Sequence, residues 1–153
     1  YLPPADDRPA SVHLAAMPEV PEKWKDEALA AKWARLIELR GEVTKALEQA
    51  RADKLIGHPL DAALIISVNR DWYAHIAPYA EDLRSLFIVS KAELVEGQTL
   101  ADAYTSDTIE GLQVKAEPAK DEKCDRCWVH DVSVGGNAAH PQICARCQKA
   151  LQI

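Results

Sequence analysis

The sequence predicts an α+β protein with three parts. Three observations predict this fold class: a long segment with helical periodicity, a group of short apolar runs that suit strands, and two C-x-x-C pairs near the end. We therefore expect a long helix from a helical bundle with an extended arm before it (1–57), a small α/β layer (58–119) and a four-cysteine zinc ribbon (120–153).

Proline dominates the first part of the chain. A segment so rich in proline cannot form the interior of a helix or a central strand, so we expect an extended arm that lies against another surface. No obvious surface for it precedes Tyr1, and we therefore expect the chain to be a piece of a longer protein. The prolines concerned are Pro3, Pro4, Pro9, Pro18 and Pro21.

Residues 23–55 contain neither proline nor a turn cluster, and they predict one helix about 50 Å long that Gly57 and Pro59 end. Its apolar residues recur at three- and four-residue steps, as in a helix of a bundle whose other members are missing. Gly41 in the middle of this helix predicts the close approach of a neighbour. The apolar face consists of Leu29, Trp33, Leu36, Val43, Leu47 and Ala50, widened by Trp24 and Ile37 and interrupted by Arg40.

The middle of the chain predicts strands and short helices. Residues 62–68 are nearly all apolar, which suits a buried strand, and residues 86–96 return to strand character after a helical stretch that Pro78 divides. Alternation over residues 112–117 predicts a half-exposed strand. The polar segment 97–110 is expected to be a mobile loop, and its Asp107 and Glu110 are expected to be solvated rather than catalytic.

Two identical cysteine pairs lie in the last part, Cys124/Cys127 and Cys144/Cys147, with sixteen residues between them. This spacing is typical of a structural zinc site, because four thiolates close the tetrahedral coordination of one zinc ion and leave no position for substrate. Disulfides and a redox-active pair are the alternatives, and they require an oxidising compartment or a thioredoxin-like setting. His130 and His140 lie between the pairs and are expected to be ordinary loop histidines.

Hairpin strands over 128–134 and 138–143 are expected to flank the turn at 135–137 and to build the ribbon. Such a module buries too little apolar surface to fold alone, so metal binding is expected to supply much of its folding free energy.

The net charge of -6 is unevenly distributed. Residues 23–55 and 120–153 carry more basic than acidic residues, whereas residues 56–119 are strongly acidic, so a polyanion is expected to meet the helix and the cysteine end. No apolar run is long enough to span a membrane, and no signal peptide, phosphate loop or nucleophile motif is present. We therefore expect a cytoplasmic protein without catalytic residues of its own.

Several motifs together resemble a known family. Cys124-Asp-Arg-Cys-Trp128 and Ile143-Cys-Ala-Arg-Cys147 resemble the zinc-binding C-terminus of bacterial isoleucyl-tRNA synthetases. The resemblance covers essentially the whole chain. It extends through residues 11–14 (Ser-Val-His-Leu), 43–48 (Val-Thr-Lys-Ala-Leu-Glu), 54–57 (Lys-Leu-Ile-Gly) and 60–62 (Leu-Asp-Ala).

The resemblance implies a parent enzyme that uses ATP to charge isoleucine tRNA, with this segment serving tRNA recognition near the anticodon. Its partners would be isoleucine tRNA and the remainder of the synthetase chain. Residues 1–57 would be the end of the anticodon-binding domain. The chain carries neither of the two signatures of the family's ATP site, so it is not expected to activate isoleucine. Met17, where the family often has Trp, is a departure that does not touch the cysteines.

Four residues of the last segment are the candidate RNA contacts. Arg126 and Arg146 precede the second cysteine of each pair, so a bound metal would hold both guanidinium groups for phosphate. Trp128 could stack on an unpaired base, although packing inside the ribbon is the favoured interpretation, and Lys149 is a further phosphate candidate. Weaker candidates lie on the long helix: Arg35, Arg51 and Lys54.

Two other functions fit the cysteine spacing. The same type of ribbon closes formamidopyrimidine-DNA glycosylases, where it contacts damaged DNA, but those proteins lack the long helix with its Lys-Leu-Ile-Gly ending. A zinc module for protein docking, with Trp128 as its anchor, is the third hypothesis and predicts no affinity for tRNA.

Overall fold

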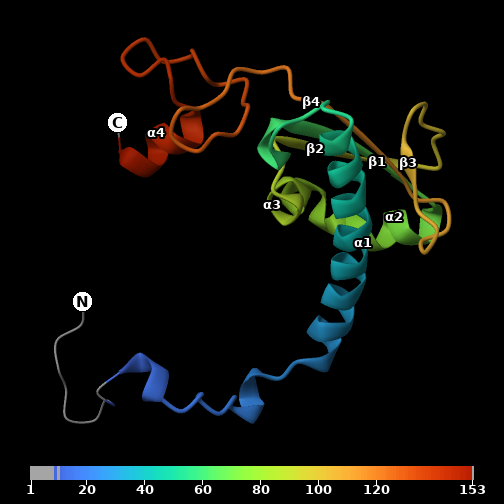
Figure 1. Ribbon diagram of the computed structural model, residues 1–153, viewed down its shortest axis with the longest axis vertical. Coiled ribbons are helices and arrows are strands. Elements are labelled where there is room, and N and C mark those ends of the chain that lie inside the picture. The colour runs from blue at the N-terminus through green and yellow to red at the C-terminus, as the bar shows by residue number, and fades with distance from the viewer. Residues whose placement is uncertain (1–8, 10, 153) are drawn as a thin grey trace. The chain divides into compact units, whose positions relative to one another are not determined.

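The computed structural model describes residue 9 and residues 11–152 (Figure 1). The expected extended arm lies partly outside the described residues, since Pro3 and Pro4 are not among them. The chain forms two compact units, one up to Trp33 and one from Ala34 onward. They are described separately.

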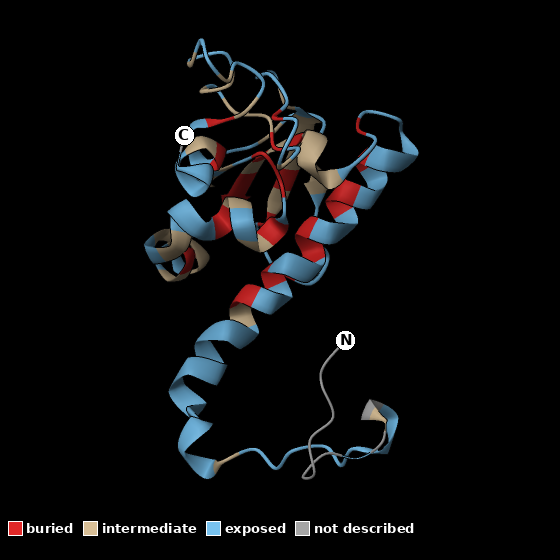
Figure 2. Ribbon diagram, turned by 90° about the vertical axis from the view of Figure 1, so that its left-hand side faces the viewer, coloured by how far each residue is buried: buried red, intermediate tan, exposed pale blue. Residues whose placement is uncertain are grey.

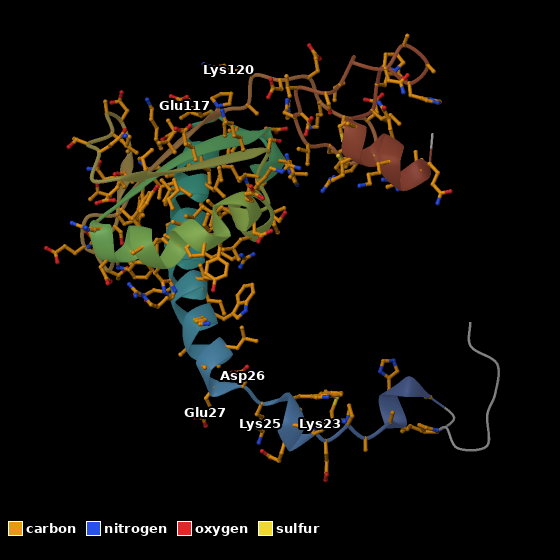
Figure 3. All side chains as sticks on the ribbon, turned by 180° about the vertical axis from the view of Figure 1, so that it is seen from behind. Lys23, Lys25, Asp26, Glu27, Glu117 and Lys120 are labelled. Atoms are coloured by element: carbon orange, nitrogen blue, oxygen red, sulfur yellow. The ribbon has the colours of Figure 1, made fainter. Side chains whose placement is uncertain are left out.

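The first unit has little regular structure before the long helix. It contains two short 3-10 turns, η1 (Val12–Leu14) and η2 (Glu22–Trp24), and the start of helix α1 (Glu27–Ala52). Lys23 lies in η2, Lys25 and Asp26 lie in the link that follows, and Glu27 begins α1 (Figure 3). The prediction that the helix begins at residue 23 was wrong, because Lys25 is extended and Asp26 caps the helix by accepting from the Leu29 N–H at 2.9 Å.

Apolar side chains of this unit are exposed rather than buried. Trp24 is 71% exposed and Met17 90%, and Leu29 and Trp33 on α1 are also exposed (Figure 2). An exposed stripe of this kind is what a bundle helix shows when its neighbours are absent.

In the second unit, α1 buries one face. Leu36, Val43, Leu47 and Ala50 are buried as expected, together with Leu39 and Ala46, whereas Ile37 is 61% exposed. The helix ends at Ala52, before the predicted end, because Lys54 takes a left-handed conformation (φ 59°). Its 26 residues span about 39 Å. The expected close neighbour at Gly41 was wrong: this glycine is exposed, and apart from the adjoining residues and backbone of its own helix, no described atom lies within 4 Å of the point that a β-carbon would occupy there.

A four-stranded mixed sheet forms the centre of the second unit. Its order is β2 (Lys91–Glu96), β1 (Ala62–Val68), β4 (Gln113–Pro118) and β3 (Tyr104–Thr105). β1 is parallel to β2 and antiparallel to β4, so Ile66 lies opposite both Leu94 and Val114. The predicted strand at 62–68 is confirmed, as is a strand over 113–117, whereas β2 begins five residues later than the predicted 86.

Short helices connect β1 to the parallel strand β2. Asn69 caps α2 (Arg70–Ile76), and the 3-10 turn η4 (Ala77–Asp82) leads into α3 (Leu83–Phe87). Pro78 falls inside η4, so the predicted division into two short helices is confirmed. Ile88 then turns left-handed (φ 58°), which delays the start of β2.

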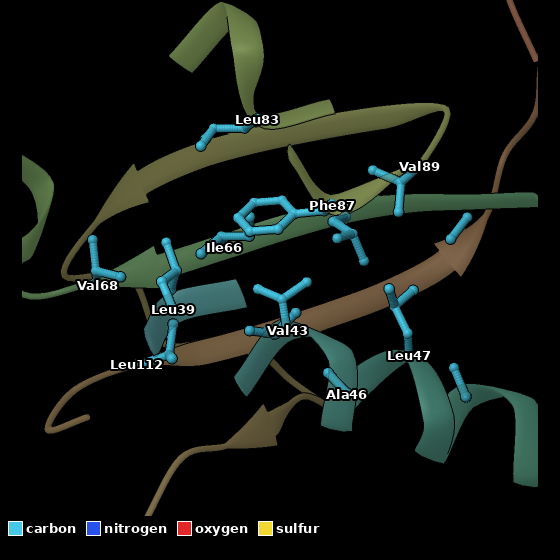
Figure 4. Close-up of a cluster of buried hydrophobic side chains, with 14 of the residues drawn as sticks. Leu39, Val43, Ala46, Leu47, Ile66, Val68, Leu83, Phe87, Val89 and Leu112 are labelled. Carbon is cyan, nitrogen blue, oxygen red and sulfur yellow. The ribbon is translucent and has the colours of Figure 1, made fainter. Parts of the chain in front are cut away.

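The hydrophobic core lies between the sheet and these helices. Alternate residues of β1 (62, 64, 66 and 68) pack with Leu39, Val43 and Leu47 of α1 and with Leu83 and Phe87 of α3 (Figure 4). On the other face of β1, Ala63 and Ile65 are only half-buried, whereas Ser67 is buried. One covered face makes this a two-layer α/β arrangement.

The segment 97–110 is more ordered than the mobile loop that the sequence predicts. It contains β3 and buries Ile109, and a buried carboxylate holds it to α1. Glu42 accepts hydrogen bonds from the Tyr104 hydroxyl at 2.8 Å and the Ser106 hydroxyl at 2.5 Å, and it pairs with Lys45 at 2.6 Å. Asp107 and Glu110 are exposed, as expected.

Among the described residues, none of the helices combines the length and the apolar character that a membrane crossing requires.

Candidate metal centre

The last segment follows β4, which contains Glu117 and ends one residue later (Figure 3). From Lys120 onward this segment folds mainly as turns. The hairpin strands expected at 128–134 and 138–143 were wrong: in the described part of this segment, the only β pairing is an isolated bridge between Lys123 and His130. Gly135 does turn the chain, with φ 87° and its N–H donating to the Pro141 carbonyl at 2.8 Å. Helix α4 (Ala145–Leu151) follows Cys144 directly.

These turns bring all four cysteines together. Their sulfur atoms lie within 4.8 Å of one another, all four are free thiols, and all but the half-buried Cys127 are buried. The Cys124–Cys147 and Cys127–Cys144 sulfur pairs are each 3.8 Å apart. Tetrahedral ligands at roughly 2.3 Å from zinc lie about 3.8 Å from one another, so the donor set fits zinc in both chemistry and spacing.

Each cysteine pair, together with the two residues between its members, is called a knuckle: residues 124–127 form the first and residues 144–147 the second. Backbone N–H groups lower the pKa of one thiol in the first knuckle. Cys124 Sγ accepts from the N–H of Cys144 at 3.3 Å. Burial alone would raise the pKa of the Cys124 thiol, but hydrogen bonds from the N–H groups of Cys144, Cys127 and Arg126 lower it to about 6. Burial raises the pKa of the Cys144 thiol instead. A divalent metal would remove this difference, because a coordinating thiol is deprotonated.

The two knuckle arginines reach across the cluster. Arg126 Nη1 lies 3.6 Å from the sulfur of Cys147, in the other pair. The Cys127 thiol, again in the other pair, is the main cause of the raised pKa of Arg146. The structure therefore brings Arg126 and Arg146 to the metal centre itself.

Trp128 does not pack inside the module, contrary to the favoured interpretation of the sequence. Its backbone is left-handed (φ 63°), which is rare for a bulky residue, and the residue is 60% exposed. The N–H of Trp128 donates to the Cys124 carbonyl at 2.8 Å and closes the first knuckle, while Val129 takes the buried place. The indole lines an open pocket of ≈ 480 Å³ with His58, Lys123, Cys124 and Asp125.

The remaining candidates are not part of the cluster. Lys149 is exposed on α4. Arg35 pairs with Asp71 at 2.7 Å and lies over the Trp72 ring, and Arg51 pairs with Glu48 at 2.8 Å. His130 and His140 are outside the cluster, as expected, because the possible metal ligands found in the described residues are the four cysteines alone.

Sequence reasoning missed the contacts that hold this segment to the sheet. Lys123 pairs with Asp61 at 2.9 Å, and His130 Nε2 lies 3.5 Å from the same carboxylate oxygen. The backbone N–H of His130 donates to the Ser90 hydroxyl at 2.7 Å. No local signal predicts pairs separated by forty residues or more.

The fold and the cluster define a protein with a structural four-cysteine metal module joined to a small α/β layer. Comparison with known proteins shows a similarity for the module: residues 121–150 match the family described as "Zinc finger found in FPG and IleRS".

Comparison of the whole chain leads to isoleucine–tRNA ligases. The chain is 41% identical to that of Geobacter sulfurreducens over 99% of its length, and 43% identical to that of Syntrophotalea carbinolica over 95%. It is 42% identical to the ligase of Thermosynechococcus vestitus over 93% of its length. In each case it covers 16% of the relative, so the chain spans about one sixth of the proteins it matches. The predicted resemblance is confirmed.

Proposed function

We propose that this chain is the tRNA-binding C-terminal part of an isoleucine–tRNA ligase, with one structural zinc ion per chain. The observation that carries the proposal is the similarity to such ligases along 99% of the chain. The similarity includes the long helix and the sheet as well as the zinc finger. This matters because the finger family by itself also includes proteins of another kind.

The metal would stabilise the fold of the module and would not take part in catalysis. Cys124, Cys127, Cys144 and Cys147 would hold zinc in a closed site, with no position for water or substrate. The segment would therefore have no catalytic residues. ATP and isoleucine would be used elsewhere in the parent ligase, and the zinc-loaded chain alone should show no isoleucine-dependent pyrophosphate exchange above background.

RNA contact would use the exposed surface of the module. The Trp128 indole is available for stacking on an unpaired base, beside His58 and Lys123. Lys149 on α4 and the outward N–H groups of Arg126 and Arg146 could bind phosphate, because each guanidinium has five donors and its contact with sulfur uses only part of them.

The first unit would meet the rest of the ligase. Its exposed Leu29 and Trp33 lie on helix α1, and the exposed Trp24 lies just before that helix begins. The remaining five-sixths of the relatives would supply the helices that cover these side chains. The domain limits at residues 57 and 119 belong to this proposal, as does a cytoplasmic location, where tRNA is charged.

The test is a titration of the zinc-loaded chain with isoleucine tRNA, an unrelated tRNA and duplex DNA, at several salt concentrations. The proposal predicts the tightest binding to isoleucine tRNA and weaker binding as salt rises. Trp128→Ala should weaken binding by about 1–3 kcal/mol if the indole stacks on a base.

Preference for duplex DNA would favour the glycosylase-like alternative, which the name of the finger family keeps open. Absence of binding to any nucleic acid at every salt concentration would favour a docking module anchored by the exposed Trp128.

A further inference from the structure

The four cysteines and the two arginines form one crosswise arrangement. Arg126 stands one residue before Cys127, yet its guanidinium lies 3.6 Å from Cys147 Sγ. Arg146 stands one residue before Cys147, yet the Cys127 thiol of the other pair is the main cause of its raised pKa. Each knuckle therefore supplies two thiols of the site and one cation for the other knuckle.

The charges of this arrangement balance. Four thiolates around one divalent zinc carry a net charge of about −2. Three of the four cysteines are buried, so water does little to solvate that charge, and a buried charge is costly unless it is paired and hydrogen-bonded. Two guanidinium groups supply the matching +2: Arg126 bonds Cys147 Sγ at 3.6 Å, and Arg146 is influenced mainly by Cys127. Arginine suits this position because its charge does not titrate in the ordinary range.

We propose that Arg126 and Arg146 are charge-compensating residues of the metal centre, and that their charges beside the four sulfurs slow the loss of zinc and the reaction of the sulfurs with electrophiles. The N–H groups of Arg126 draw on the Cys147 lone pairs that a proton or an alkylating agent would otherwise attack. The two sulfurs concerned are the second ligand of each pair, so the protection is shared between the knuckles.

This role goes beyond nucleic-acid binding, and it changes how arginine variants are read. A variant that weakens RNA binding could do so by losing a phosphate contact or by loosening the zinc site. The two causes differ in a measurement without RNA: only the second alters zinc retention.

The experiment compares methionine and lysine at each arginine in the whole zinc-loaded chain. Both side chains keep an unbranched stem of similar size, and only lysine keeps the charge. The readouts are the rate at which zinc passes to a colorimetric chelator and the rate at which iodoacetamide alkylates the four cysteines. Lys149→Met is the matched control, because Lys149 is an exposed cation of the same module.

We expect R126M and R146M each to lose zinc about 10–100-fold faster than the unaltered chain, the range typical for loss of an outer partner of a metal ligand. R126K and R146K should retain zinc nearly as well as the unaltered chain, and K149M should match it.

Two results would overturn the proposal. Methionine variants that keep zinc and resist alkylation as well as the unaltered chain would show that the contacts with sulfur are incidental. Lysine variants that lose zinc as fast as the methionine variants would show that the shape of the guanidinium matters and its charge does not. Either result leaves RNA binding by the chain to be judged by its own titration.

Discussion

The α/β layer and the metal module are stabilised in different ways. The layer buries a continuous set of apolar side chains from α1, the sheet and α3. The buried cluster of the module consists of three cysteines, with Cys127, Val134 and Ile143 partly buried around them, and Val129 is buried outside that cluster. Few apolar side chains are left to hold the module without a metal. The chain thus combines a region that folds by burial with a region that folds by coordination.

This difference explains why the two regions show different sequence patterns. Burial requires a periodicity spread over many positions, so no single residue of the layer is indispensable. Coordination requires four ligands at fixed spacing, so each of the four cysteines of the module is indispensable. Changes in the two regions should therefore differ in size and in how far they spread.

The largest effect is expected for Cys144→Ser. Losing one thiolate should remove most of the roughly 10–16 kcal/mol of apparent binding energy that a structural zinc supplies. Elemental analysis should find close to one zinc per unaltered chain and almost none in the variant, while the α/β layer keeps its circular dichroism signal. Val132→Ala is the control, since Val132 is 85% exposed in the same module. A variant that retains a full equivalent of zinc would contradict the four-thiolate site.

Leu39→Ala should produce the opposite pattern. Leu39 is fully buried in the core beneath the sheet, and its truncation should destabilise the layer by about 2–5 kcal/mol. Urea unfolding would measure the loss, with Ile37→Ala as the control because Ile37 is mostly exposed two residues earlier. Zinc content should not change. Loss of zinc together with the layer would mean that the two regions fold as one.

Glu42 tests whether a buried polar contact contributes to the layer. The hydrogen bond to Lys45, with help from the Ser106 hydroxyl, lowers the pKa of Glu42 from 4.5 to about 2. A carboxylate with a lowered folded-state pKa stabilises the fold above its unfolded pKa, and this stabilisation is lost as the pH falls from about 4.5 to about 2. Glu42→Gln should therefore cost about 2 kcal/mol at pH 7 and progressively less in that acid range.

The control for Glu42 is Glu38→Gln, an exposed carboxylate on the same helix. Stability would be followed by urea unfolding at each pH. The difference in unfolding free energy between Glu42→Gln and the unaltered chain should shrink as the pH falls to 2. A difference that stays constant over this range would contradict the assigned role.

The smallest effect is expected where the two regions meet. Asp61→Asn removes the ion pair with Lys123 and the carboxylate beside His130, both partly exposed, so the unfolding free energy should change by about 1 kcal/mol or less. The amides of residues 119–131 should exchange faster with solvent, and neither the core nor the zinc content should change. Lys115→Met, which removes a pair within β4, is the matched control.

The parts of the fold that depend on local pattern could be predicted. The run at 62–68 indicated β1 to the residue, and the role of Pro78 followed from its missing N–H. The limits of α1 could not be predicted, because the left-handed turn at Lys54 and the cap at Asp26 depend on backbone choices that periodicity does not reveal. The prediction of a close neighbour at Gly41 failed because no other part of the described chain packs against this glycine.

The same distinction holds for the candidate site. Spacing alone was enough to bring the four cysteines into one cluster. It could not show that Trp128 turns outward, since that follows from a positive φ at a bulky residue. Nor could it show that Arg126 contacts the opposite pair, because the path of the chain between residues 128 and 143 decides that.

The most direct test of the central claim is amide hydrogen exchange of the unaltered chain with zinc and after its removal by a chelator. If the module folds by coordination and the layer by burial, removing zinc should abolish protection across residues 121–150 and leave the core strands at 62–68 and 113–118 protected. Protection of 121–150 that survives metal removal, or loss of protection in both regions together, would contradict the account.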